Sequence, residues 1–227
     1  MFTAHRNDVT KRITEVRLLL DLVRNMEAPP PAVDSLEVRV LRGLFFVHLY
    51  SVLEFTINGA VERFLAGVGD LQVKAQHFEP AFLSVALDST FSSLRMVSEE
   101  KRWPKRLEVW SRAASEEICP VNSGIFGLYL QNVWVERIDA LSSCLNVGEP
   151  MIPNSAYRGY VDELVDRRNG VAHGRFSAAG VGGVRRSPDL QIRLNAISET
   201  CLNILDVLED GLDSRCVVQE KFRGLYP

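Results

Sequence analysis

An arginine and a histidine stand close together in this sequence, Arg168 and His173, and Asn169 directly follows the arginine. A histidine side chain titrates near neutral pH and can move protons as a general acid or base. An arginine keeps its positive charge and can hold two phosphate oxygens at once. The two side chains together have the chemistry to bind a phosphate ester and to transfer a proton at it.

Apolar residues at helical spacing place this stretch on a helix. They predict an inward-facing stripe made by Val161, Leu164, Val165 and Ala172. Arg168 falls on the same stripe, and a buried guanidinium requires a carboxylate, a phosphate or several other acceptors. Glu54 has the matching need, because it is a lone carboxylate in the apolar middle of another predicted helix. We therefore expect Arg168 and Glu54 to pair, either structurally or as part of a site.

A polar stripe runs along an adjoining face of this helix. It consists of Asp162, Asp166, Asn169 and His173. His173 falls at the helix end before Gly174, where its imidazole is exposed, and about 140° of helix rotation separates it from Arg168. Both side chains reach one substrate only at a groove edge, by unwinding at Gly170, or across two subunits. A symmetric dimer with the helix ends facing each other is the simplest of these solutions.

Hydrophobic periodicity predicts helices along most of the chain. The expected helices run from Val9 to before Pro29, from Asp34 or Ser35 to Gly67 or Gly69, from Leu128 to Gly148, from Asn154 or Ser155 to Gly174, and from the capping Ser187-Pro188 onward. The second of these is apolar nearly all round, which is typical of a helix surrounded by others. We expect His48, on this central helix, to be a hydrogen-bonded core residue.

Two stretches lack clear periodicity. Residues 70 to 127 predict short helices and loops, with the basic cluster Lys101 to Arg106 in a solvated loop where Trp103 can stack on a base. Residues 174 to 187 combine Gly180, Gly182 and Gly183 with arginines and predict a mobile, basic loop. The tail after Gly211 predicts a strand or an extended segment.

The composition, 46% hydrophobic and 24% charged over 227 residues, is that of a folded globular protein, and we expect a single domain over residues 1–227. A net charge of -3 requires any nucleic-acid contact to come from a local basic patch. The four cysteines form no metal-ligand or disulfide pattern, so we expect neither a metal nor another cofactor. The polar start and the interrupted apolar run Leu44 to Leu53 indicate a cytoplasmic protein outside the membrane.

The stretch from Leu164 to Gly174 resembles the Arg-x(4 to 6)-His motif of the HEPN superfamily, in which an Arg-Asn pair is often followed by Ala-His-Gly. The apolar stretch from Leu44 to Phe55 is similar to the long second helix of bacterial HEPN proteins of the ribonuclease-like branch. The resemblance implies an all-α, up-and-down helical bundle. The residue pattern above adds a long central second helix and an irregular middle insertion to this expectation. The resemblance also implies dimerisation through the helices that carry the motif.

The resemblance further implies a metal-independent endoribonuclease, in which the 2′-hydroxyl of RNA attacks the neighbouring phosphate and leaves a 2′,3′-cyclic phosphate and a 5′-hydroxyl. Carried over, His173 is the general acid or base, Arg168 holds the phosphate or organises the site, and Asn169 matches the polar residue that follows the arginine. Glu54 and Asp166 are supporting residues, with a buried partner and a surface pair as their structural alternatives. The candidates for RNA binding are Arg167, Arg175, Arg185 and Arg186.

The leading hypothesis is therefore a homodimeric HEPN ribonuclease that acts on RNA as a toxin or defence effector, with an antitoxin protein as a partner. A noncatalytic HEPN interaction module and a helical regulator that binds nucleotides are the alternatives.

Overall fold

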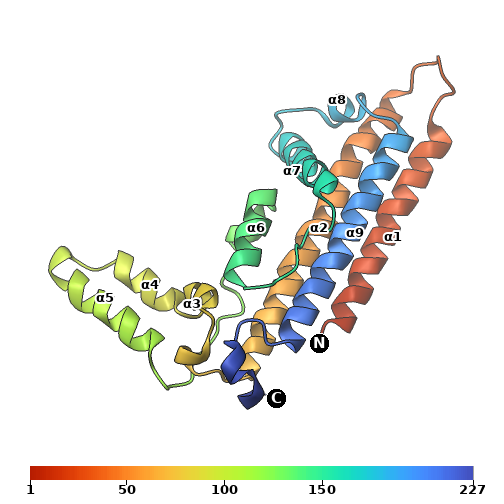
Figure 1. The fold of residues 1–227 in the computed structure, drawn as a ribbon. Coiled ribbons are helices and arrows are strands. Elements are labelled where there is room, and N and C mark those ends of the chain that lie inside the picture. The colour runs from red at the N-terminus through yellow and green to blue at the C-terminus, as the bar shows by residue number, and fades with distance from the viewer. Residues whose placement is uncertain (227) are drawn as a thin grey trace.

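Three long helices form the body of the molecule in the computed structural model, which describes residues 1–226. These are α1 (Thr3–Met26), α2 (Leu36–Asp70) and α9 (Ser187–Asp213), and they lie side by side along the bundle (Figure 1). The chain runs up α1, down α2 and down α9, and both outer helices contact α2. The expected all-α bundle around a long central second helix is confirmed.

Helix α2 is central because almost every face of it is apolar. Ser35 caps its first turn by accepting a hydrogen bond from the backbone N–H of Val38 at 3.4 Å, as one of the two predicted caps. Phe45, Leu53 and Phe64 are completely buried among the neighbouring helices. The helix is long and apolar enough to cross a membrane, but more than half of its most apolar window is buried inside the bundle. Those buried side chains already have protein neighbours, as expected for a core helix.

The helix predicted from Leu128 is shorter than expected. Helix α6 spans Val135–Cys144, and a short 3₁₀ turn precedes it. The hydroxyl of Tyr50 on α2 accepts a hydrogen bond from the backbone N–H of Val133 at 3.1 Å, so this N–H is held outside a helix. The carboxylate of Asp162 then accepts from the backbone N–H of Val135 at 3.1 Å and stabilises the first turn of α6. A long-range contact, invisible in the local periodicity, therefore decides where this helix begins.

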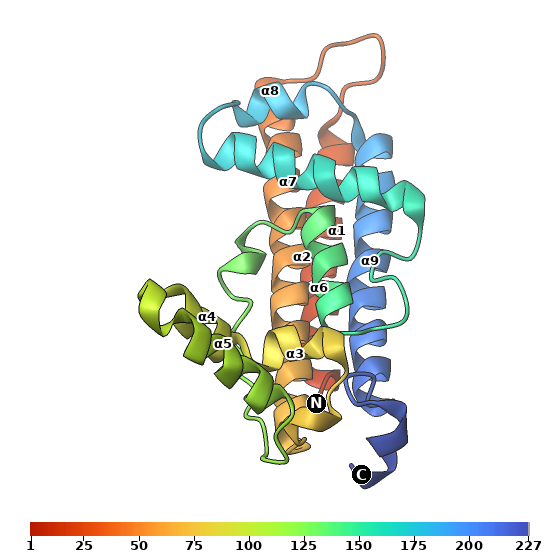
Figure 2. The ribbon, with the colours of Figure 1, turned by 60° about the vertical axis from the view of Figure 1, so that its left-hand side comes forward.

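The middle of the chain contains short helices and loops, as predicted: α3 (Pro80–Ala86), α4 (Asp88–Arg95) and α5 (Glu99–Ala113). Helices α4 and α5 form an arm that projects from the bundle (Figure 2). The basic cluster lies within α5, so its expected loop conformation is wrong. Two acidic residues in the first turn of α5 and an ion pair of 2.6 Å between Lys105 and Glu108 favour the helix despite Pro104.

The stretch after Gly174 is not a mobile loop. It contains helix α8 (Ala178–Gly182), which packs against α2 (Figure 1). A Cβ atom added to Gly43 would lie 2.0 Å from the carbonyl oxygen of Ala178, and one added to Gly182 would lie 1.9 Å from that of Arg39. The glycines in this stretch therefore allow two backbones to approach closely rather than keeping the chain flexible.

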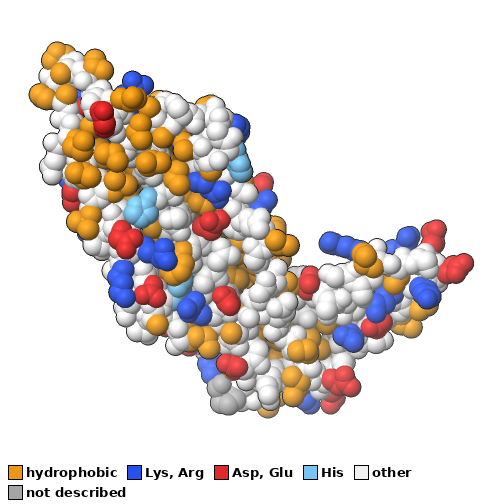
Figure 3. Space-filling model, turned by 180° about the vertical axis from the view of Figure 1, so that it is seen from behind, with side chains coloured by type: hydrophobic (Ala, Val, Ile, Leu, Met, Phe, Trp, Pro, Cys, Tyr) orange, Lys and Arg blue, Asp and Glu red, His pale blue; other side chains and the backbone are white. Residues whose placement is uncertain are grey.

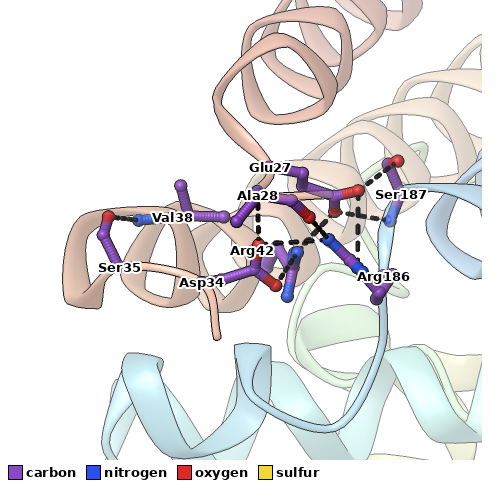
Figure 4. A network of polar contacts seen from close by, with 8 residues as sticks. All are labelled: Glu27, Ala28, Asp34, Ser35, Val38, Arg42, Arg186 and Ser187. Carbon is purple, nitrogen blue, oxygen red and sulfur yellow. Dashed lines mark hydrogen bonds and ion pairs between the residues drawn. The ribbon is translucent and has the colours of Figure 1, made fainter. Parts of the chain in front are cut away.

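A buried ion-pair network holds the loop between α1 and α2 against the start of α9 (Figure 4). The side chain of Arg42, 2% exposed, contacts the carboxylates of Glu27 and Asp34 at 2.6 Å each. Arg186 reaches Asp34 at 3.2 Å and also donates to the backbone carbonyl of Ala28. Both backbone and side chain of Ser187 donate to Glu27 at 2.8 Å, so Ser187 begins α9 as its first residue rather than as its cap.

Two smaller expectations are corrected by the packing. His48 is partly exposed rather than a core residue, and its Nε2 lies 3.8 Å from the carboxylate of Glu15 on α1. The tail after α9 forms a 3₁₀ helix, Glu220–Leu225, and Val218 makes only an isolated bridge with Phe78. No strand is present within residues 1–226.

Candidate active site

Helix α7 (Arg158–Ala172) carries the predicted reactive residues and crosses α2 (Figures 1 and 2). Asn154 begins the preceding turn by accepting a hydrogen bond from the backbone N–H of Ala156 at 2.9 Å. The inward stripe is confirmed for its first three members, Val161, Leu164 and Val165, which are buried. Ala172 is exposed instead, because the last turn of α7 extends past α2 (Figure 2).

Arg168 points inward, as its position on the stripe predicts, and its side chain is only 15% exposed. The guanidinium carbon lies 3.7 Å from the centre of the Tyr50 ring, a close cation–π contact. Its Nη2 donates to the backbone carbonyl of Gln131 at 3.1 Å. The same Nη2 lies 3.5 Å from Oε1 of Glu54, so the expected contact with Glu54 is present. It is longer than the 2.7 to 2.9 Å, roughly, of a tight charge-assisted hydrogen bond.

Tyr50 is the residue that sequence reasoning missed. Its buried hydroxyl lies 3.1 Å from both Oε1 of Glu54 and the carbonyl oxygen of Gln131, and its single proton can be donated to either acceptor. Burial raises the pKa of Tyr50, so the hydroxyl keeps its proton at neutral pH. The available signal was helical spacing, because Tyr50 precedes Glu54 by one turn on α2.

Polar groups around the guanidinium retain unused hydrogen-bonding capacity. Of the four buried side-chain atoms without a hydrogen-bond partner within residues 1–226, three belong to Arg168 and to residues next to it or to Gln131 in the sequence: Nε of Arg168, Oδ1 of Asn169 and Oδ1 of Asn132. Asn132 directly follows Gln131, which contacts Arg168. A buried polar atom without a partner costs free energy, so such atoms mark a place that favours water or a polar ligand.

His173 caps the C-terminal end of α7 and is exposed to solvent. The helix ends there because Gly174 adopts the left-handed conformation, with φ of +69°. The chain then turns back, and the backbone N–H of Phe176 donates to the carbonyl of Gly170 at 3.0 Å. A Cβ atom on Gly170 would lie 2.3 Å from the Phe176 ring, so this glycine accommodates the ring beside the His173 turn. Helix α7 passes through Gly170 without unwinding.

The arginines expected to bind RNA differ in their surroundings. Arg185 lies 2.8 Å from Glu163, and Arg186 belongs to the network around Arg42. The prediction of a free basic loop is therefore wrong for these two, because carboxylates of the folded chain already compensate their charges. Arg175 is exposed and lies 4.0 Å from Asp166, a loose surface pair. Arg167 is half-buried on α7.

The described part of the chain offers little support for chemistry that depends on a metal ion or on a reactive cysteine. No group of three or more His, Cys, Asp or Glu side chains within residues 1–226 is placed to hold a metal ion. All four cysteines are free thiols, and burial raises the pKa of Cys201 to about 12 and that of Cys216 to about 11.

Comparison with known protein families places this geometry in context. The model of the family described as RiboL-PSP-HEPN matches residues 7–210, which include α2, α7 and the Arg168 to His173 stretch. No curated protein and no solved structure matches the chain.

Proposed function

This chain belongs to the HEPN superfamily, in the family described as RiboL-PSP-HEPN, and we propose that it is a metal-independent endoribonuclease that acts as a homodimer. Membership supports an RNA-related nuclease or a nucleotide-binding module at the coarse level. The observation that carries the finer proposal is the pairing of a fixed Arg168 with an exposed His173 at the end of the same helix.

The proposed reaction uses only groups of the chain and the RNA itself. The 2′-oxygen forms a bond to the neighbouring phosphorus while the bond from phosphorus to the 5′-oxygen breaks, which leaves a 2′,3′-cyclic phosphate and a 5′-hydroxyl. One His173 accepts the proton of the 2′-hydroxyl, and a second donates a proton to the leaving 5′-oxygen. Arg168 binds the non-bridging phosphate oxygens, whose negative charge grows in the transition state.

A homodimer supplies the second histidine and relieves the geometric conflict on α7. Arg168 points inward over Tyr50, whereas His173 is exposed at the helix end, so one helix presents the two side chains in different directions. An exposed apolar face supports self-association. It includes Leu18, Leu22 and Met26 of α1 and Leu44 of α2. Figure 3 shows apolar side chains gathered on this side of the bundle, at the end away from the α4–α5 arm.

The test is digestion of a mixed-sequence RNA with a chelator present, comparing wild type with His173→Ala and Arg168→Ala. We expect wild-type cleavage to leave 5′-hydroxyl ends, which polynucleotide kinase labels directly, and each variant to lose at least about 100-fold in rate. Arg158→Ala is the matched control for Arg168→Ala, since Arg158 is an arginine at the other end of α7 that pairs with Asp139 at 2.6 Å. An inactive wild type, or cleavage undiminished in both variants, would refute the proposal. Light scattering that shows a strict monomer would refute the dimer.

A role as a toxin or defence effector, held in check by an antitoxin protein, follows from this activity as a proposal. Induced expression of the wild type in a bacterial host should arrest growth, and His173→Ala should not.

The noncatalytic interaction or nucleotide-binding module is the second candidate. This candidate is favoured because Arg185 pairs with Glu163 and Arg186 pairs with Asp34, so two cations are removed from a potential RNA-binding surface.

We also propose that residues 1–227 form one domain that acts in the cytoplasm. Helices α1, α2, α6, α7 and α9 contribute to a single cluster of buried apolar side chains, which also includes Phe82 of α3 and Val218 of the tail. A single cooperative unfolding transition is the expected result, superimposable by circular dichroism and by tryptophan fluorescence, to which Trp103 and Trp110 of the arm and Trp134 before α6 all contribute. Two separate transitions would instead indicate that the α4–α5 arm folds independently.

A further inference from the structure

Three charged or polar side chains meet beneath the exposed end of α7: Tyr50, Glu54 and Arg168. The hydroxyl of Tyr50 and Nη2 of Arg168 both face the same oxygen of Glu54, Oε1, at 3.1 Å and 3.5 Å respectively. The carboxylate is therefore shared, and its shorter contact is with the neutral phenol rather than with the cation.

This preference is unusual for an arginine and a carboxylate in contact. Such a pair normally closes to roughly 2.7 to 2.9 Å and is often bidentate, because two N–H groups fit two carboxylate oxygens. The Glu54 side chain is 36% exposed. The Tyr50 hydroxyl can donate its proton to Oε1 of Glu54 at 3.1 Å, and its oxygen accepts from the backbone N–H of Val133 at 3.1 Å.

The remaining contacts of Arg168 fix its plane without using every donor. The Tyr50 ring supports one face of the guanidinium, and the carbonyl of Gln131 accepts from Nη2. Within residues 1–226, neither Nη1 nor Nε of Arg168 makes a hydrogen bond. A closed Glu54 pair would occupy a second donor and neutralise the cation, and both effects oppose binding of a phosphate.

We propose that Tyr50 is a positioning residue that holds Glu54 away from full pairing with Arg168 and so keeps the guanidinium available for an RNA phosphate. The inference rests on the proposed function of this site in RNA binding, but not on cleavage. It assigns two separate tasks to one side chain: the ring orients the cation, and the hydroxyl restrains the competing anion.

The test measures binding of a mixed-sequence 2′-O-methyl RNA oligonucleotide, which lacks the attacking hydroxyl and cannot be cleaved. Fluorescence anisotropy gives the Kd for wild type, Tyr50→Phe, Glu54→Gln and the double variant. Tyr50→Phe keeps the ring under Arg168 and removes only the hydroxyl. We expect its Kd to rise about tenfold, since Glu54 is then free to close onto Arg168. The double variant, which carries Tyr50→Phe and Glu54→Gln together, should bind with a Kd within about twofold of that of Glu54→Gln alone, because an amide carries no competing charge.

The matched control is Tyr157→Phe. The Tyr157 hydroxyl donates to Glu199 at 2.6 Å, so this change also removes a contact between a phenol and a carboxylate, but outside the site. We expect no change in Kd for it. Circular dichroism verifies that each variant is folded, and the rescue by Glu54→Gln separates positioning from a general loss of structure, which an added amide would not repair.

The outcomes distinguish this inference from the proposed function. An unchanged Kd in Tyr50→Phe, or a loss that Glu54→Gln does not reverse, overturns the role of Tyr50 alone. Wild-type binding with the expected rescue, but without cleavage of ordinary RNA, supports the inference and removes the ribonuclease. A wild type that does not bind the oligonucleotide overturns both.

Discussion

Replacement of Arg42 by methionine should destabilise this protein more than replacement of any exposed arginine. The Arg42 side chain is 2% exposed, and its guanidinium contacts Glu27 and Asp34, whose side chains are only 10% and 11% exposed. Methionine fills much of the same volume but leaves both carboxylates without their central partner. Removal of one member of a buried ion pair costs about 3 to 5 kcal/mol, because the other charge stays desolvated.

For Arg42→Met we expect the free energy of unfolding to fall by about 3 kcal/mol, near the lower end of that range. Arg186 still reaches Asp34 at 3.2 Å, and Ser187 still donates two hydrogen bonds to Glu27, so neither carboxylate becomes fully unpaired. Urea unfolding followed by circular dichroism gives the free energy of unfolding. Arg24→Met is the matched control: Arg24 pairs with Asp21 at 2.9 Å and both are about half exposed. Arg24→Met should lower the free energy of unfolding by less than about 1 kcal/mol.

The same network predicts a pH dependence. Burial by itself raises the pKa of the Asp34 carboxyl, but hydrogen bonds from Arg42 and from the backbone N–H of Ala28 outweigh it, and the pKa is lowered overall from 3.8. A carboxyl with a lower pKa in the folded state contributes stability above its unfolded pKa and loses it as the pH falls through the folded value. Asp34→Asn should therefore lose stability at neutral pH and unfold with a weaker dependence on acid pH. Equal losses for Arg42→Met and Arg24→Met, or an unchanged acid profile, would refute this reasoning.

Three further predictions concern other parts of the fold. Gly182→Ala should lower the free energy of unfolding by about 1 to 3 kcal/mol, since its Cβ would lie 1.9 Å from a backbone carbonyl of α2, whereas Gly159→Ala, with open space around it, should raise it by about 0.5 to 1 kcal/mol. Chemical unfolding of both variants checks this, and equal effects would contradict the packing of α8. Gly170→Ala should displace the Phe176 ring and lower the rate of RNA cleavage with little change in oligonucleotide affinity, because the ring packs on Gly170 beside the turn that carries His173. A lowered affinity at unchanged rate would contradict it. Cys201, completely buried with its pKa raised to about 12, should resist alkylation by iodoacetamide at pH 8 until urea unfolds the chain, as mass spectrometry of its peptide can verify.

Local sequence patterns determined the helical architecture and the direction of Arg168. The apolar spacing in α1, α2 and α9 follows from the helical repeat, and Ser35 and Gly174 mark helix ends by their own conformational preferences. The contact of Arg168 with Glu54 could also be predicted, because two charged residues on otherwise buried faces have few alternatives to each other. Each of these inferences uses properties that a residue carries within its own helix.

Only the tertiary structure decided how the remaining polar groups are used. The glycine-rich stretch before α9 becomes helix α8 because its backbone meets the glycine-containing face of α2, and no local pattern reports that close approach. The charges of Arg185 and Arg186 are matched by Glu163 and Asp34, which lie 22 and 152 residues away in the chain. Tyr50 enters the site because α7 crosses α2 at the turn that carries it. Pairings over such separations depend on how whole helices pack, which periodicity within one helix does not specify.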